Sequence, residues 1–67
     1  MSNKHLKSPL LFKIRRNDQT VAHGCVFTNG KCVVSWEGKH RSIVVWDSLD
    51  DLKQVNGHPG TIFIFED

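Results

Sequence analysis

Three pairs of turn-forming residues divide residues 10–47 into four short segments in which apolar and polar side chains alternate. The pairs are Asn17-Asp18, Asn29-Gly30 and Gly38-Lys39. Asn-Gly between alternating segments is a strong hairpin signal, because both central residues of a type I′ turn need positive φ. The pattern therefore predicts four antiparallel strands, at residues 10–16, 21–28, 31–37 and 41–47.

A helical period replaces the alternation after residue 47. Ser48 can accept hydrogen bonds from the free backbone N–H groups at a helix start, and Gly57 suits the left-handed conformation that ends many helices. The apolar residues of this segment fall on one side: Leu49, Leu52 and Val55. We expect a short helix whose apolar side covers the sheet.

The last residues complete the expected architecture. Residues 61–65 follow a turn rich in Gly and Pro and predict a final strand. The fold class is then α+β: an antiparallel sheet of four to five strands, in the order ββββαβ, with one short helix packed on one face. A sheet that curls into a small barrel is an alternative. We expect a flexible, basic N-terminus at residues 1–8 and one β-rich domain at residues 9–67.

Two-residue turns at all three positions set the expected registers. They place these side chains on a single face, the expected core: Leu10, Phe12, Ile14, Val21, His23, Cys25, Phe27, Cys32, Val34, Trp36, Ile43 and Val45. A three-residue loop at the third turn would turn the fourth strand over. Cys25 and Cys32 lie diagonally on this face, beyond good disulfide geometry, so we expect two buried free thiols.

The opposite face should be polar in a two-layer domain, yet its expected centre is apolar. The interface candidates there are Leu11, Val26, Val33, Val44 and Trp46. An apolar centre with a charged rim is typical of a protein contact surface. Two explanations stay open. Either the sheet curls or the N-terminal segment covers this face, or the face binds a second copy or a host protein.

The ligand-binding candidates form one row across the expected core face, together with a histidine in the last turn. They are Phe12, His23, Trp36, Arg41 and His58. Bases stack on aromatic rings, and Arg binds phosphate through two parallel hydrogen bonds, so the row fits a nucleotide-like small molecule. The competing interpretation is structural: a buried histidine, an arginine lying over Trp36, and ordinary turn chemistry at His58.

Basic residues near the N-terminus suggest nucleic-acid binding as an alternative function. They are Lys4, Lys7, Lys13, Arg15 and Arg16, in a stretch without acidic residues. Such a segment can bind a phosphate backbone, but the net charge of the chain is only +2. A solvated surface explains the same charges.

The chain contains no recognisable catalytic motif: no Gly-rich phosphate loop, HExxH, CxxC or nucleophile elbow. A zinc site would need His23, Cys25 and Cys32 with a fourth ligand from His40 or His58, and apolar core cysteines are the simpler explanation. We expect no enzyme activity, no metal and no cofactor. With no apolar segment long enough for a membrane and no secretory signal, we expect a protein of the host-cell cytoplasm.

Three stretches carry a family resemblance: residues 32–38, 48–51 and 56–61. They combine a valine-rich strand bearing Trp, a Ser-Leu-acid helix start and a Gly-His-x-Gly turn. Over residues 20–65 the chain resembles small β-rich proteins of phages and mobile elements. The resemblance implies a phage-type accessory protein that acts by binding, as a host-defence inhibitor that blocks a host protein or sequesters a nucleotide signal.

Overall fold

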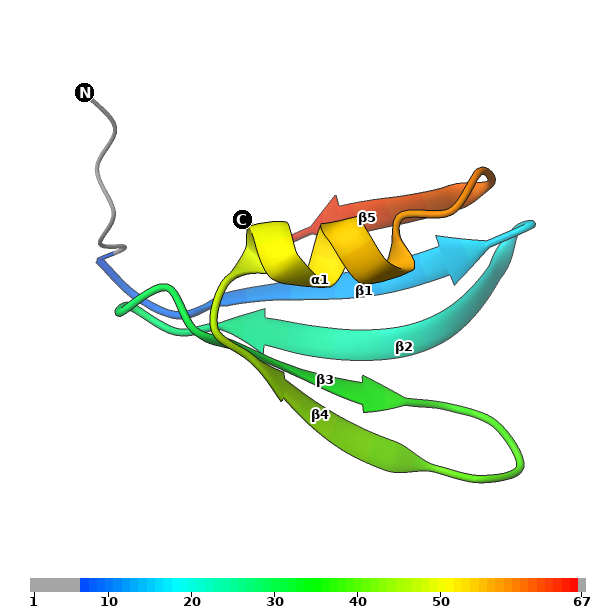
Figure 1. The fold of residues 1–67 in the computed structure, drawn as a ribbon, viewed down its shortest axis with the longest axis horizontal. Helices are drawn as coiled ribbons and strands as arrows, with labels where there is room; N and C mark the ends of the chain where they lie inside the picture. Colours follow the sequence, from blue (N-terminus) through cyan, green and yellow to red (C-terminus); the bar gives the residue numbers. More distant parts are fainter. Residues whose placement is uncertain (1–6, 67) are drawn as a thin grey trace.

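A computed structural model of the chain describes residues 7–66, which form an open antiparallel sheet with one helix on one face (Figure 1). The strand order across the sheet is β4-β3-β2-β1-β5. The elements are β1 (Leu10–Arg16), β2 (Gln19–Val26), β3 (Cys32–Trp36), β4 (Ser42–Trp46), α1 (Leu49–Asn56) and β5 (Thr61–Phe65).

The expected order ββββαβ is confirmed, and the barrel alternative is not supported. After β4 the chain crosses the sheet through α1, and β5 pairs with β1 at the opposite side. β4 and β5 are consequently the two edges of an open sheet. The fold is mostly β, with a single short helix.

Helix α1 begins as the sequence predicts. The Ser48 side chain accepts a hydrogen bond from the backbone N–H of Asp51 at 3.1 Å, and Asp50 and Asp51 occupy the first turn, where the helix dipole favours acidic groups. The expected left-handed ending at Gly57 is wrong. Its φ is −88°, and its N–H continues the helical pattern by donating to the carbonyl of Lys53 at 2.8 Å.

The β1–β2 hairpin has the predicted two-residue turn but not the predicted register. Asn17 and Asp18 both have positive φ, 51° and 69°, as a type I′ turn requires. A β-bulge then leaves Val21 without a partner on β1, so Ile14 pairs with Ala22. The extra residue turns the rest of β2 over relative to expectation.

The β2–β3 hairpin contains a three-residue loop. The Gly30 N–H donates to the Phe27 carbonyl at 2.9 Å, and the Phe27 N–H donates to the Lys31 carbonyl at 2.8 Å. Gly30 has φ 93°, the left-handed residue that such loops need. This shift cancels the effect of the bulge, so β3 presents its expected residues to the core.

The β3–β4 register also differs by one residue, because Val34 pairs with Val44 where the two-residue turn predicted Ile43. No later shift compensates, so β4 is turned over. This is the outcome that a longer third loop would produce.

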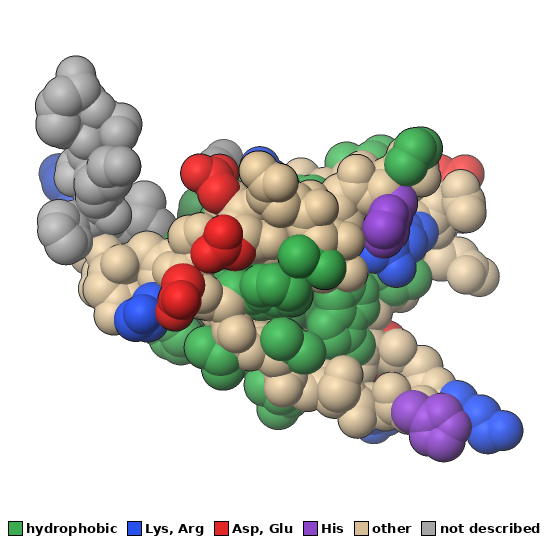
Figure 2. Space-filling view, in the orientation of Figure 1, with side chains coloured by type: hydrophobic (Ala, Val, Ile, Leu, Met, Phe, Trp, Pro, Cys, Tyr) green, Lys and Arg blue, Asp and Glu red, His purple; other side chains and the backbone are tan. Residues whose placement is uncertain are grey.

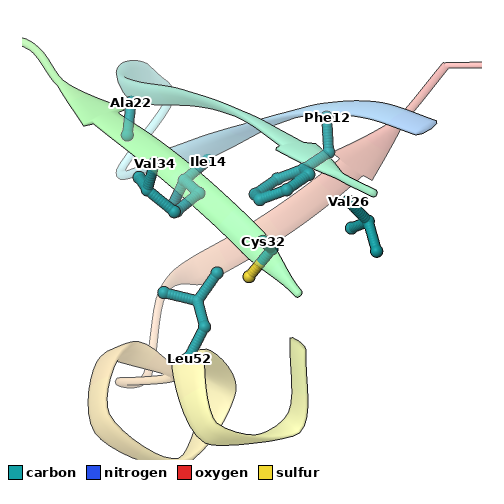
Figure 3. Packing of buried hydrophobic residues seen from close by; sticks show 7 residues of the cluster. All are labelled: Phe12, Ile14, Ala22, Val26, Cys32, Val34 and Leu52. Carbon is teal, nitrogen blue, oxygen red and sulfur yellow. The ribbon is translucent and has the colours of Figure 1, made fainter. Parts of the chain in front are cut away.

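The resulting core lies between the sheet and α1. Its buried members are Phe12, Ile14, Ala22, Val26, Cys32, Val34 and Leu52. Figure 3 shows Leu52 reaching from α1 towards the strands that carry Ile14, Val34 and Cys32. Five expected core residues are excluded from it: His23, Cys25, Phe27, Ile43 and Val45. The bulge, the longer loop and the turned-over fourth strand account for these differences.

Candidate functional site

The helix leaves part of the core face incompletely covered beside β3 and β4. Trp36 on β3, Trp46 on β4 and Leu49 on α1 pack against the core but stay half-buried. Figure 2 shows apolar side chains gathered between α1 and the β3–β4 hairpin. We call the surface formed by Trp36, Val44, Trp46 and Leu49 the helix–hairpin strip.

Arg16 lies at one end of this strip, over Trp36. Its guanidinium carbon is 5.5 Å from the centre of the Trp36 ring, in cation–π geometry. Nε donates to the Thr61 hydroxyl at 3.1 Å, and Nη2 lies 3.4 Å from the Asn56 carbonyl and 3.5 Å from its side-chain oxygen. The start of β5 and the end of α1 therefore hold a cation against an aromatic ring.

The sequence prediction assigned this position over Trp36 to Arg41, which is wrong. β4 is turned over, and Ser42 is the residue that pairs with Trp36. Arg41 precedes β4 and is exposed. Arg16 could have been found from the sequence, because alternation from Phe12 through Ile14 places it on the core face.

The predicted row of ligand residues is divided by the fold. Phe12 is 2% exposed and packs on Phe65 and Phe63, with ring centres 5.3 and 6.2 Å away, so no ligand reaches it. His23 is exposed on the opposite face of the sheet. Trp36 is the member of the row that contacts Arg16.

His58 lies in the connection between α1 and β5, between the two residues that bind Arg16. Its carbonyl accepts a hydrogen bond from the Thr61 N–H at 3.0 Å, and the residue is exposed. His58 is therefore an exposed residue in the segment that joins the two partners of Arg16.

The second face of the sheet is bare in the described part of the chain, because α1 covers the other face (Figure 1). Its apolar members, which we call the open face, are Leu11, Cys25, Val33, Ile43, Val45, Ile62 and Ile64. Four are more than half exposed: Leu11 53%, Ile43 71%, Val45 69% and Ile62 58%.

The second face is apolar, as the sequence predicts, but most of the residues expected there lie on the core face. Leu11 and Val33 do lie there. Val26, Val44 and Trp46 lie on the core face, since β2 and β4 are turned over. Cys25, Ile43 and Val45 take their places.

A polar row crosses the open face. Lys13 on β1 pairs with His23 on β2, which pairs with Ser35 on β3. At the sheet's end near the β2–β3 loop, Lys31 and Asp47 form an exposed ion pair at 3.2 Å. An exposed pair of this kind contributes little to the stability of the fold. Its main effect is to place one positive and one negative charge at this edge of the open face.

The two cysteines are free and lie on opposite faces, not diagonally on one. Cys32 is buried, with Sγ 3.8 Å from the carbonyl of Ser48. Burial raises the pKa of its thiol, and the nearby charges of Asp51 and Cys25 raise it further. This arrangement separates the residues considered for zinc, and residues 7–66 contain no group of three His, Cys, Asp or Glu placed to hold a metal.

The basic residues considered for nucleic-acid binding do not form one stripe. Lys4 lies outside the described residues. Lys13 belongs to the open face, whereas Arg16 faces α1. Arg15 donates to the carbonyl of Asp18 at 2.7 Å. Lys13 and Arg16 therefore lie on opposite sides of the sheet.

Across residues 7–66, no helix is both long and apolar enough to cross a membrane.

Comparison with known proteins identifies a family. No curated protein and no solved structure matches the chain. A family model described as Acb5 phage protein matches residues 14–65, which is most of the sequence and includes α1 and four complete strands. The chain therefore belongs to the Acb5 family of small phage proteins.

Proposed function

We propose that this phage accessory protein inhibits host defence without catalysis, by binding a cyclic oligonucleotide signal in the helix–hairpin strip. The family abbreviation stands for anti-CBASS, and CBASS denotes bacterial defence that signals with cyclic oligonucleotides. A protein that binds such a signal tightly would withhold it from the host effector.

The observation that carries the proposal is the placement of Arg16 over Trp36. A base can stack on an aromatic ring, and a guanidinium can bind a phosphate through charge-assisted hydrogen bonds. Because Thr61 and Asn56 already fix the Arg16 side chain, less conformational entropy is lost when a ligand binds.

The surroundings of Arg16 supply further groups suited to a nucleotide. The half-buried Trp46 provides a second aromatic side chain on the same face, and Ser42 is an exposed hydroxyl opposite Trp36. His58 is exposed at the end of α1. Pockets for small molecules typically combine apolar walls with a few polar groups of this kind.

The absence of an oriented base supports binding over catalysis. In residues 7–66, no side chain forms a hydrogen bond with the imidazole of His58, although its carbonyl bonds to Thr61. A general base needs a partner that sets its orientation and protonation, and a nucleophile needs such a base. We therefore propose that the ligand is released chemically unchanged.

The test is titration of the protein with a cyclic dinucleotide and a cyclic trinucleotide, followed by calorimetry and tryptophan fluorescence. We expect Arg16→Gln to weaken binding by about 10- to 100-fold, the effect of losing a charged hydrogen bond. Arg15→Gln is the matched control, because the adjacent arginine bonds to the β1–β2 turn instead. It should change Kd less than about twofold.

The state of the bound nucleotide separates binding from catalysis. After incubation and denaturation of the protein, mass spectrometry should recover the intact cyclic molecule. Recovery of a linear product would show an enzyme. Lack of binding by both probes, or equal effects of Arg16→Gln and Arg15→Gln, would remove the helix–hairpin strip as the site.

A further inference from the structure

We infer that the open face is the interface of a homodimer in which two sheets pack face to face and the helices lie outside. This inference is independent of the nucleotide proposal, because the open face and the helix–hairpin strip lie on opposite sides of the sheet. It assigns the bare apolar surface to one occupant, a second copy of this chain.

The degree of exposure shows that the open face is incomplete in a single copy. Ile43 and Val45, two residues apart on the same side of β4, are each about 70% exposed. Leu11 and Ile62 are more than half exposed. Monomers rarely leave this many large apolar side chains exposed on one face, even where a polar row crosses it. A domain of 67 residues also has little core of its own, so association adds stability that it lacks.

The size of the face suits a dimer. Five strands spaced by about 4.8 Å make it about 20 Å wide. A standard interface buries about 800 Å² on each partner, roughly one-sixth of the accessible surface of 5069 Å². A complete side of a two-layer domain can supply this area, and two such faces can pack about 10 Å apart as in β-sandwiches.

The charges at the strand ends are self-complementary. Alternation places Asp47 and Arg41 at opposite ends of β4 on this side, and Lys31 and Glu37 at opposite ends of β3. A two-fold axis perpendicular to the strands would bring each residue over the opposite charge of the partner: Asp47 over Arg41 and Lys31 over Glu37. An isologous interface requires this kind of pattern.

The same charges favour a protein copy over a polyanion. Lys31 is already paired with Asp47, and both side chains keep enough exposure, 54% and 87%, to meet a second partner. A nucleic-acid surface would need an excess of positive charge. Here acids and bases balance at the ends of β3 and β4, and the apolar side chains lie on both sides of the polar row of Lys13, His23 and Ser35. A protein interface combines apolar and polar groups in this way.

Sedimentation velocity over protein concentrations from about 1 to 100 µM tests the inference. We expect a species of twice the 7.7 kDa chain mass. Ile43→Asp should raise the dimer Kd at least tenfold, because it replaces a 71% exposed apolar side chain of the open face with a charge. Val55→Asp is the matched control, since Val55 is 56% exposed but belongs to α1. It should leave the dimer unchanged.

Alkylation of the native protein gives a second measurement that needs no variant. Cys25 lies on the open face and Cys32 in the core, so dilution should speed alkylation of Cys25 while Cys32 stays protected. A wild-type monomer at 100 µM, equal effects of Ile43→Asp and Val55→Asp, or a Cys25 rate independent of concentration would each overturn the homodimer.

Discussion

The ring of Phe12 lies directly over Gly24, its partner on the neighbouring strand. A Cβ added at Gly24 would be 2.7 and 2.8 Å from ring carbons Cε1 and Cε2, closer than carbon atoms approach in proteins. The ring cannot move aside, because Phe63 and Phe65 pack on it from β5. The missing side chain at Gly24 on β2 is therefore what leaves room for the aromatic cluster of β1 and β5.

Gly24→Ala should destabilise the protein by about 1–3 kcal/mol, the usual cost of overpacking a core. Urea unfolding followed by circular dichroism measures the loss. Phe12→Leu in the same chain should recover part of it, because the smaller side chain leaves room for the new methyl group. Ser35→Ala, on the open face, is the control and should change the free energy of unfolding by less than about 0.5 kcal/mol. Additive effects of Gly24→Ala and Phe12→Leu would contradict the steric explanation.

Ser48→Ala should lower the free energy of unfolding by about 1 kcal/mol, because the Asp51 N–H loses its hydrogen-bond acceptor. Ser48→Asn keeps a capping oxygen and should stay within a few tenths of a kcal/mol of the wild type. Thermal and urea unfolding of the three proteins provide the comparison. Equal losses for the two variants would show that the hydroxyl does not act as a cap.

Cys32 should make the protein less stable in alkali. Burial holds the pKa of its thiol in the folded state above the ordinary value of 9.0. The contribution of the neutral thiol to the free energy of unfolding is therefore complete below pH 9. It is lost as pH rises from 9 through the folded-state pKa, because in this range the thiol ionises more readily in the unfolded chain than in the folded one. Cys32→Ala should cost stability at pH 7 but flatten this alkaline loss. Urea midpoints at pH 7 and at several values above 9 test it; parallel pH profiles would contradict it.

Trp46 carries a buried donor without an acceptor. Within residues 7–66, its indole Nε1 has no hydrogen-bond partner, a condition that costs about 1–3 kcal/mol. Trp46→Phe removes the donor while losing some apolar area, so we expect a net change within about 1 kcal/mol in the free energy of unfolding. Trp46→Ala removes the whole ring and should cost about 3 kcal/mol or more. A large loss in the Phe variant would mean that the indole N–H is satisfied in solution.

The elements of this fold could be predicted from the sequence because their signals are local. Ser48 caps α1, Asn17-Asp18 forms the predicted two-residue turn, and β5 has its predicted bounds. The face of the sheet to which a side chain points depends instead on the number of residues between the paired positions of two neighbouring strands. The unpaired Val21 and the longer loop around Gly30 change that count without leaving a distinct pattern in the sequence.

The presence of an apolar second face could be predicted although its members could not, and β4 shows why. Ile43 and Val45 alternate with Val44 and Trp46, so this strand is apolar on both sides. Turning it over exchanges one apolar pair for the other. The ligand row depended on individual side chains, so the reversal of β2 separated His23 from Trp36 and the reversal of β4 separated Arg41 from it.

The bulge at Val21 has an evolutionary consequence. In a shorter chain lacking this residue, the two-residue turn would pair Ile14 directly with Ala22, as it does here. Gain or loss of one codon at this point would change the bend of the hairpin but not the identity of the buried residues. A gap placed after Ala22 in β2 would instead exchange inside for outside in the residues that follow it.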